Sequence, residues 1–171
     1  MPMIVVNEHG TVPDPATALA DHERWMIDNQ FAKFDAVVSR DLIPTIDHRF
    51  RTIADREHRA LAGLSMGGAE AMRIGLHHLD LFAFIGLFSP AIGNLDPVRD
   101  YGGKLADANK QLRLLWIGIG RDDASFFPGV RKSHEALKNA AIRHIWFESD
   151  GAHTWTVWRE YLAAFAPGLF R

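Results

Sequence analysis

Short apolar runs alternate along the chain with longer stretches in which apolar residues recur at helical spacing. Strands are predicted for 3–6, 59–64, 82–88, 112–119 and 143–148, and helices for 13–34, 35–50, 67–78, 133–141 and 154–165. Pro44 is expected to kink or end the second helix. Alternating strands and helices predict parallel βαβ units with right-handed crossovers. The strands are apolar on both faces, which indicates an α/β fold with an open, doubly wound, mostly parallel sheet.

The bulk composition fits one domain over residues 1–171 and narrows the classes of partner. Apolar residues make up 47% of the chain and the formal net charge is −2, so no basic footprint for nucleic acid is present. Without cysteine, the chain has no disulfide, thiolate metal site or thiol nucleophile. The segment Met1 to Glu8 does not read as a signal peptide, and no apolar run is long enough for a membrane span. The chain as it stands is therefore expected to be cytoplasmic, with no membrane partner.

Ligands of such sheets bind beyond the carboxyl ends of the strands. Four turns of this chain qualify, at residues 7–10, 65–68, 120–125 and 150–155. Catalytic groups are expected to come from these turns.

The second of these turns carries a candidate nucleophile. The sequence GLSMGG from Gly63 to Gly68 follows an apolar run and opens a helix, which is the context required of a G-x-S-x-G elbow. A sharp strand-to-helix turn pushes the Ser65 hydroxyl into the cleft and needs small flanking residues. The N–H of Met66, at the start of the helix, points at the same place and is the expected oxyanion donor.

Nine histidines compete for the role of the base that takes the serine proton. His153 lies in the turn GAHTW directly after the last predicted strand, and it stands last in the order Ser, acid, His that α/β-hydrolases use. His9 also follows a strand at this edge of the sheet and is the only rival. The other histidines that we considered lie at the opposite edge or on helices: His144, His77, His78 and His134.

The acid that orients this histidine is expected in the turn after 112–119. Asp122 and Asp123 both qualify, and the residue pattern alone does not separate them; the remaining one would shape the turn or cap a helix. Asp150 lies close to His153 in sequence, but it reads better as part of an Asp150-Gly151 turn.

Taken together, these segments resemble the esterase D / feruloyl esterase group of α/β-hydrolases, of the carbohydrate esterase family 1 type. The resemblance rests on residues 59–68, the 120–123 turn and the turn around His153 with Trp155 and Trp158, and it runs from about residue 3 to residue 170. It implies a serine carboxylesterase acting through an acyl-enzyme, with a small-molecule ester of feruloyl, acetyl or aryl type as substrate and with no cofactor or metal. It also implies Asp123, rather than Asp122, as the acid of a Ser65-His153-Asp123 triad. Trp155 would line an aromatic acyl pocket or pack the last helix.

The resemblance also implies that the first strands of the fold, and the loop that supplies a second oxyanion donor, are lacking here. Three explanations compete: a fragment or shortened product with weak activity, a second chain that completes the sheet as a homo-oligomer, or Met3 to Val6 in the vacant strand position with residues 8–10 as the oxyanion loop. Because unpaired strand edges are avoided, re-pairing or oligomerisation is expected. A monomer in solution scattering with an open strand edge would count against both. The alternative function is a non-catalytic hydrolase-fold module for binding or assembly.

Overall fold

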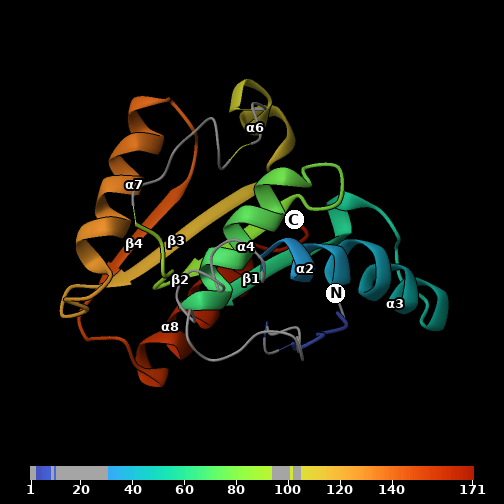
Figure 1. Cartoon of the computed structure of the whole chain (residues 1–171), viewed down its shortest axis with the longest axis horizontal. Coiled ribbons are helices and arrows are strands. Elements are labelled where there is room, and N and C mark those ends of the chain that lie inside the picture. Colours follow the sequence, from blue (N-terminus) through green and yellow to red (C-terminus); the bar gives the residue numbers. More distant parts are fainter. Residues whose placement is uncertain (1–2, 9, 11–30, 94–100, 102–104) are drawn as a thin grey trace.

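The structure, a computed structural model, describes residues 3–8, 10, 31–93, 101 and 105–171 (Figure 1). The strands are β1 (Ala60–Leu64), β2 (Phe84–Phe88), β3 (Leu114–Gly120) and β4 (Ile145–Ser149). The α-helices are α2 (Phe31–Ala36), α3 (Ile43–Arg49), α4 (Met66–His77), α6 (Leu105–Gln111), α7 (Phe127–Asn139) and α8 (Trp155–Phe165). A π-helix, η3 (Val37–Leu42), joins α2 to α3, and two short 3₁₀ turns are η4 (Arg56–His58) and η5 (Ala166–Gly168).

The four strands form one parallel sheet in which the spatial order repeats the chain order, β1-β2-β3-β4. Gly63 pairs with Leu87, and Leu87 pairs in turn with Ile117. The parallel pairing confirms the predicted α/β class. It also brings the carboxyl ends of β1, β3 and β4 to one edge of the sheet, where the turns that follow them meet.

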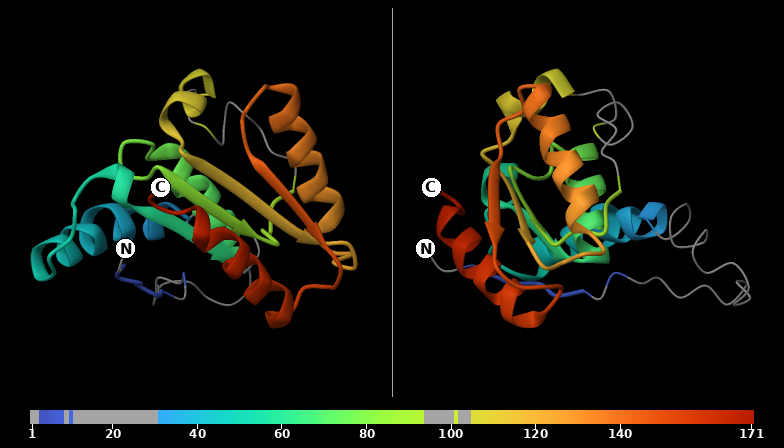
Figure 2. Two further views of the ribbon diagram at one scale, coloured as in Figure 1. Left: turned by 180° about the vertical axis from the view of Figure 1, so that it is seen from behind. Right: turned by 90° about the vertical axis from the view of Figure 1, so that its left-hand side faces the viewer.

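Helices cover both faces of the sheet (Figures 1 and 2). On one face α4 and α7 pack on alternate residues of β2 and β3, among them Ile85, Leu87, Ile117 and Ile119. On the other face α8 packs through Tyr161 and Phe165 against Phe88 and Trp116. Since successive side chains of a strand point to opposite faces, strands buried on both faces need apolar residues throughout, as this sequence has them.

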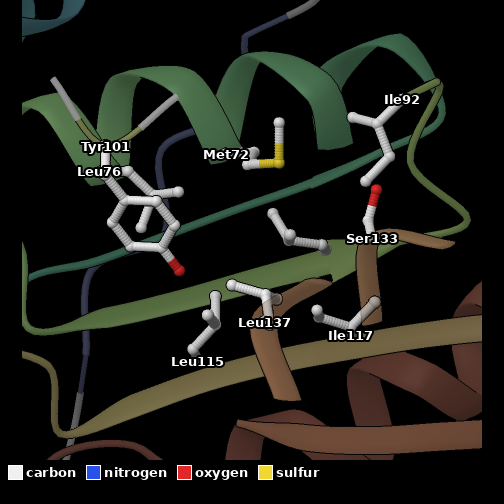
Figure 3. Close-up of a pocket in the computed structure, with 9 residues that line it drawn as sticks. Met72, Leu76, Ile92, Tyr101, Leu115, Ile117, Ser133 and Leu137 are labelled. Atoms are coloured by element: carbon white, nitrogen blue, oxygen red, sulfur yellow. The ribbon is translucent and has the colours of Figure 1, made fainter. Parts of the chain in front are cut away.

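The core between α4, α7 and the sheet is closely filled. Figure 3 shows Met72 and Leu76 of α4 and Leu137 of α7 pointing toward Leu115 and Ile117 of β3. The gap between these side chains is too narrow for a water molecule. It belongs to the packing of the core and offers no room for a substrate.

Met3 to Val6 was predicted as a strand, and that prediction is wrong. The segment is in no strand, and its four side chains are exposed by 43% to 70%. A β-branched run becomes a strand only where a neighbour supplies backbone hydrogen bonds, and no described strand lies beside it. Within the described residues β1 pairs only with β2, so its other edge is open and the re-pairing expected for this segment does not occur.

Three other elements differ from the prediction. Pro44 does not end the helical path: the Ile43 N–H bonds to Val38 O, five residues back, and Pro44 then falls in the first turn of α3, where its missing N–H costs nothing. The helix predicted for 133–141 is α7, which begins earlier, at Phe127, with Pro128 in its first turn. The short helix α6 was not predicted at all. Residues 11–30, where a long helix was expected, lie outside the described part of the chain.

No helix among the described residues is both long enough and apolar enough to cross a membrane.

Candidate active site

Ser65 occupies the turn between β1 and α4 in a backbone conformation that L-residues rarely adopt. Its φ is 53° and its ψ is −119°. Neighbouring backbone groups hold it there: the Ser65 N–H bonds to Phe88 O at 2.9 Å, and the Ala91 N–H bonds to Ser65 O at 2.8 Å. Strain held by the surrounding structure is a common feature of functional sites.

The glycines around the turn show which close approaches it needs. A Cβ on Gly63 would lie 2.0 Å from the carbonyl oxygen of Gly67, and one on Gly68 would lie 2.9 Å from Pro90 Cα. A Cβ on Gly67 would meet nothing within 4 Å. The expectation of small flanking residues therefore holds for Gly63 and Gly68, whereas Gly67 contributes the backbone that approaches Gly63.

Three of the predicted side chains lie in one hydrogen-bonded line. The distance from Ser65 Oγ to His153 Nε2 is 2.8 Å, and that from His153 Nδ1 to Asp123 Oδ2 is 2.7 Å. Ser65 comes from the β1–α4 turn, Asp123 from the turn after β3, and His153 from the turn between β4 and α8. Such a line lets an imidazole accept the serine proton at Nε2 while its Nδ1–H stays bonded to a carboxylate.

The two neighbouring aspartates have different positions. The Asp123 residue is 2% exposed, and its other oxygen, Oδ1, accepts the N–H of Phe126 at 3.3 Å. Asp122 is exposed, and its Oδ2 accepts the N–H of Gly151 at 3.1 Å. Asp122 therefore ties the turn after β3 to the turn that carries His153, which is a structural task.

Two aromatic rings flank the imidazole of His153. The ring of Phe126 lies 4.8 Å away, and that of Trp158 lies 4.8 Å away at 90°, edge to face. Together they restrict the plane of the ring. In the sequence Trp158 stood out through the resemblance to the feruloyl esterase group, and no pattern pointed to Phe126.

The remaining candidates occupy different positions. Met66 is the first residue of α4, where N–H groups lack an intrahelical acceptor, so its N–H is available beside Ser65. His9, the rival base, lies outside the described residues, and with it most of the loop considered as a second oxyanion donor. His78 bonds through Nε2 to Asp35 Oδ1 at 2.7 Å, His144 lies at the amino end of β4, and exposed Asp150 pairs with Arg121.

Glu70 is an ionisable residue buried in the helix that follows Ser65, and no pattern in the sequence pointed to it. It is 3% exposed, and its Oε1 has no hydrogen-bond partner within the described residues. A Cβ on Gly10 would lie 2.4 Å from Glu70 Oε2, so the backbone of that glycine rests on the carboxyl group. Burial raises the pKa of Glu70 from an ordinary 4.5 to about 7.

This raised pKa makes stability depend on pH. The folded protein holds the Glu70 proton up to about pH 7, whereas the unfolded chain releases it near pH 4.5. The protonated Glu70 therefore contributes its full stabilisation of the folded state below pH 4.5. This contribution is lost as the pH rises through about 7. Relative to Glu70→Gln, the unfolding free energy of the wild type is expected to fall by about 1–3 kcal/mol between pH 5 and pH 8. Urea unfolding at both pH values measures it, with the exposed Glu160→Gln as control. A wild-type-minus-variant difference that does not change with pH would contradict the assignment.

Within the described part of the chain, no three histidine, aspartate or glutamate side chains are grouped to hold a metal ion.

Comparison with known proteins places this chain in a family. Residues 4–169 match the family model Esterase, described as "Putative esterase". The chain is 36% identical over 140 residues to an endo-1,4-beta-xylanase/feruloyl esterase of Xylanibacter ruminicola, covering 81% of this chain and 18% of that protein. It is 28% identical over 174 residues to an esterase of Mycobacterium tuberculosis, covering 76% of this chain and 36% of that protein.

Solved structures agree on the fold. A CE1 ferulic acid esterase from Anaeromyces mucronatus, in complex with ferulic acid, superposes with a TM-score of 0.80 at 23% identity, over 94% of this chain and 62% of that one. An S-formylglutathione hydrolase from Staphylococcus aureus superposes with a TM-score of 0.58 at 17% identity, over 74% of this chain and 60% of that one. The chain thus spans less than two thirds of the length of these relatives. The resemblance to the feruloyl esterase group is confirmed, and the chain belongs to the esterase family.

Proposed function

We propose that this chain is a serine carboxylesterase that uses Ser65, His153 and Asp123 as its catalytic triad. The single observation that carries the proposal is the hydrogen-bonded line from Ser65 Oγ through the imidazole to Asp123, with both distances below 3 Å. A serine hydroxyl is a weak nucleophile at neutral pH, and this arrangement is what activates it. The chemistry requires no metal or cofactor.

The reaction follows from the positions of the groups. Ser65 Oγ attacks the ester carbonyl carbon while His153 Nε2 takes the hydroxyl proton, and the Met66 N–H stabilises the negative carbonyl oxygen. His153 then gives the proton to the leaving alcohol, which leaves an acyl group on Ser65. A water molecule, deprotonated by the same imidazole, attacks the acyl carbon; the proton returns to Ser65 Oγ and the carboxylic acid departs. Asp123 keeps the proton of the neutral imidazole on Nδ1 throughout.

We propose feruloyl, acetyl or small aryl esters as the substrate class. The support is the family and the names of two relatives, a xylanase/feruloyl esterase and a ferulic acid esterase. The exposed Trp155, at the start of α8 two residues after His153, offers an aromatic surface near the reacting group.

The open edge of β1 favours a second candidate, a non-catalytic module for binding or assembly. It also supports the proposal that a strand of a second copy completes the sheet, which a monomer in solution scattering would contradict. Loss of one oxyanion donor lowers kcat by about 10²–10³-fold. The catalytic rate is therefore expected to depend on whether a second chain completes the site.

A fluorophosphonate probe separates the two functions, because it reacts only with a serine that a base activates. The esterase proposal expects stoichiometric labelling of the wild type, with the adduct on Ser65 by peptide mass spectrometry, together with hydrolysis of p-nitrophenyl acetate. A folded protein that neither labels nor hydrolyses would support the binding module.

A further inference from the structure

A pair of imidazoles lies away from Ser65, where α7 runs beside β4 (Figure 2). His134 is on α7, and His144 directly precedes β4. His134 Nδ1 and His144 Nε2 are 2.7 Å apart. Because β4 has five residues, a length of about 16 Å separates its amino end from the turns that carry the candidate active site. The pair is therefore distinct from the esterase machinery.

The hydrogen bonds around the pair fix where its protons sit. His144 Nδ1 lies 2.8 Å from Ile142 O, and a carbonyl oxygen only accepts, so this nitrogen carries the proton. His144 Nε2 then carries a lone pair, which accepts a hydrogen bond from the Nδ1–H of His134. Metal-binding histidines commonly have this form, with one ring N–H donated to a backbone carbonyl and the other nitrogen left to bind.

His134 has a carboxylate near its outer nitrogen, beyond hydrogen-bonding distance. Its Nε2 lies 3.9 Å from Glu135 Oε1. If the proton of neutral His134 moves from Nδ1 to Nε2, Nδ1 gains a lone pair and the new N–H lies near this carboxylate. Both nitrogens that face each other then offer lone pairs, while both outer nitrogens carry protons near acceptors.

Neighbouring groups limit how far the two imidazoles can move. The ring of His134 stacks on that of Trp146, with centroids 4.4 Å apart and planes at 20°. The turn before β4 is fixed by Asn109: its Nδ2 donates to Ala141 O at 2.7 Å, and its Oδ1 accepts the Arg143 N–H at 2.8 Å. Such a rigid support lowers the entropic cost of binding.

Arg131 and Lys138 are the cations near His134, and Glu135 is its anionic neighbour. These cations repel a dication, which limits the affinity that two imidazoles can give.

We propose that His134 Nδ1 and His144 Nε2 bind one borderline divalent transition-metal ion, with solvent completing its coordination. Imidazole nitrogens favour Zn²⁺, Ni²⁺ and Cu²⁺ over Mg²⁺ and Ca²⁺. At Zn–N distances of about 2.0–2.1 Å and a tetrahedral angle, the two nitrogens lie about 3.3–3.4 Å apart. They therefore separate by about 0.6–0.7 Å from their present 2.7 Å, which small rotations of the two side chains supply. The ion ties α7 to the edge strand β4.

Calorimetric titration of tag-free protein with ZnCl₂ at pH 7.5 tests the site. One equivalent is expected in the wild type, weakened at least about 100-fold in His134→Gln and in His144→Gln, and about 10-fold in Glu135→Gln, which keeps both ligands. His48→Gln, at an exposed histidine of α3, is the matched control and should bind as the wild type does. MgCl₂ should show no binding at this site.

Electron paramagnetic resonance of wild type loaded with one equivalent of Cu²⁺ gives a readout that does not depend on the variants folding. Two coordinating imidazole nitrogens are expected, with the second lost in His144→Gln. Absence of Zn²⁺ binding, binding unchanged in His144→Gln, or a spectrum with fewer than two nitrogens would overturn the proposal. None of these measurements involves ester hydrolysis, so the proposal stands or falls separately from the esterase function.

Discussion

Ser65→Ala is expected to lower kcat for hydrolysis of p-nitrophenyl acetate by about 10⁴–10⁶-fold, down to the background of the preparation. Without the hydroxyl no acyl-enzyme forms, and the imidazole of His153 has no nucleophile to deprotonate. The Met66 N–H remains, so only the small contribution of oxyanion stabilisation survives. Fluorophosphonate labelling should disappear in the same variant.

Ser125→Ala is the matched control, because Ser125 is an exposed serine close in sequence to Asp123. It should hydrolyse and label as the wild type does. The replacement at residue 65 removes only a hydroxyl, and the positive φ of that position is already occupied by an L-residue, so circular dichroism and the melting temperature should stay close to wild type. Hydrolysis that persists unchanged in folded Ser65→Ala would refute the proposed nucleophile.

Asp123→Asn is expected to lower kcat by about 10³–10⁴-fold. An asparagine keeps the size of the side chain, and its oxygen can still accept the Phe126 N–H that Asp123 Oδ1 accepts at 3.3 Å. Its NH₂ group, placed toward His153, donates to Nδ1 and forces the imidazole proton onto Nε2. That nitrogen then has no lone pair for the Ser65 hydroxyl, so the variant folds with its serine unactivated.

Asp122→Asn is the control for this variant, since it makes the same chemical change one residue away. Asp122 accepts the Gly151 N–H and lies outside the line to Ser65, so its loss should leave hydrolysis close to wild type. Steady-state kinetics of both variants distinguish the two aspartates. A larger loss in Asp122→Asn than in Asp123→Asn would reverse their proposed roles.

The positions of Ser65 and His153 could be predicted from the sequence because each depends on residues close to it in the chain. The turn at Ser65 follows from glycines within a few residues of it, and the position of His153 follows from the end of a strand. Which of Asp122 and Asp123 bonds to His153 depends on which carboxyl group faces inward after the turn, and no pattern of residue types encodes that. The pairing of His134 with His144, and the burial of Glu70, depend on contacts between elements and were invisible for the same reason.

The fold could be predicted where an element depends on its own periodicity. The strands β1 to β4 are apolar runs covered on both faces, and their class and parallel order follow from the alternation with helices. Met3 to Val6 has a similar composition but lacks a neighbouring strand in the part of the chain that the structure describes, which shows that composition alone does not make a strand. The early start of α7 and the π-helix that precedes Pro44 reflect local hydrogen bonding, which a search for apolar spacing does not detect.

The strands lie in the sheet in the same order as they follow one another along the chain, and this has a consequence for biosynthesis. Each strand of β1-β2-β3-β4 can dock, as it leaves the ribosome, on the strand made just before it, so the sheet grows in one direction during translation. The serine turn emerges first and the histidine turn last. Under the proposed triad, a nascent chain carries no activated hydroxyl until His153 has been made, and a chain that terminates before His153 is expected to be inert.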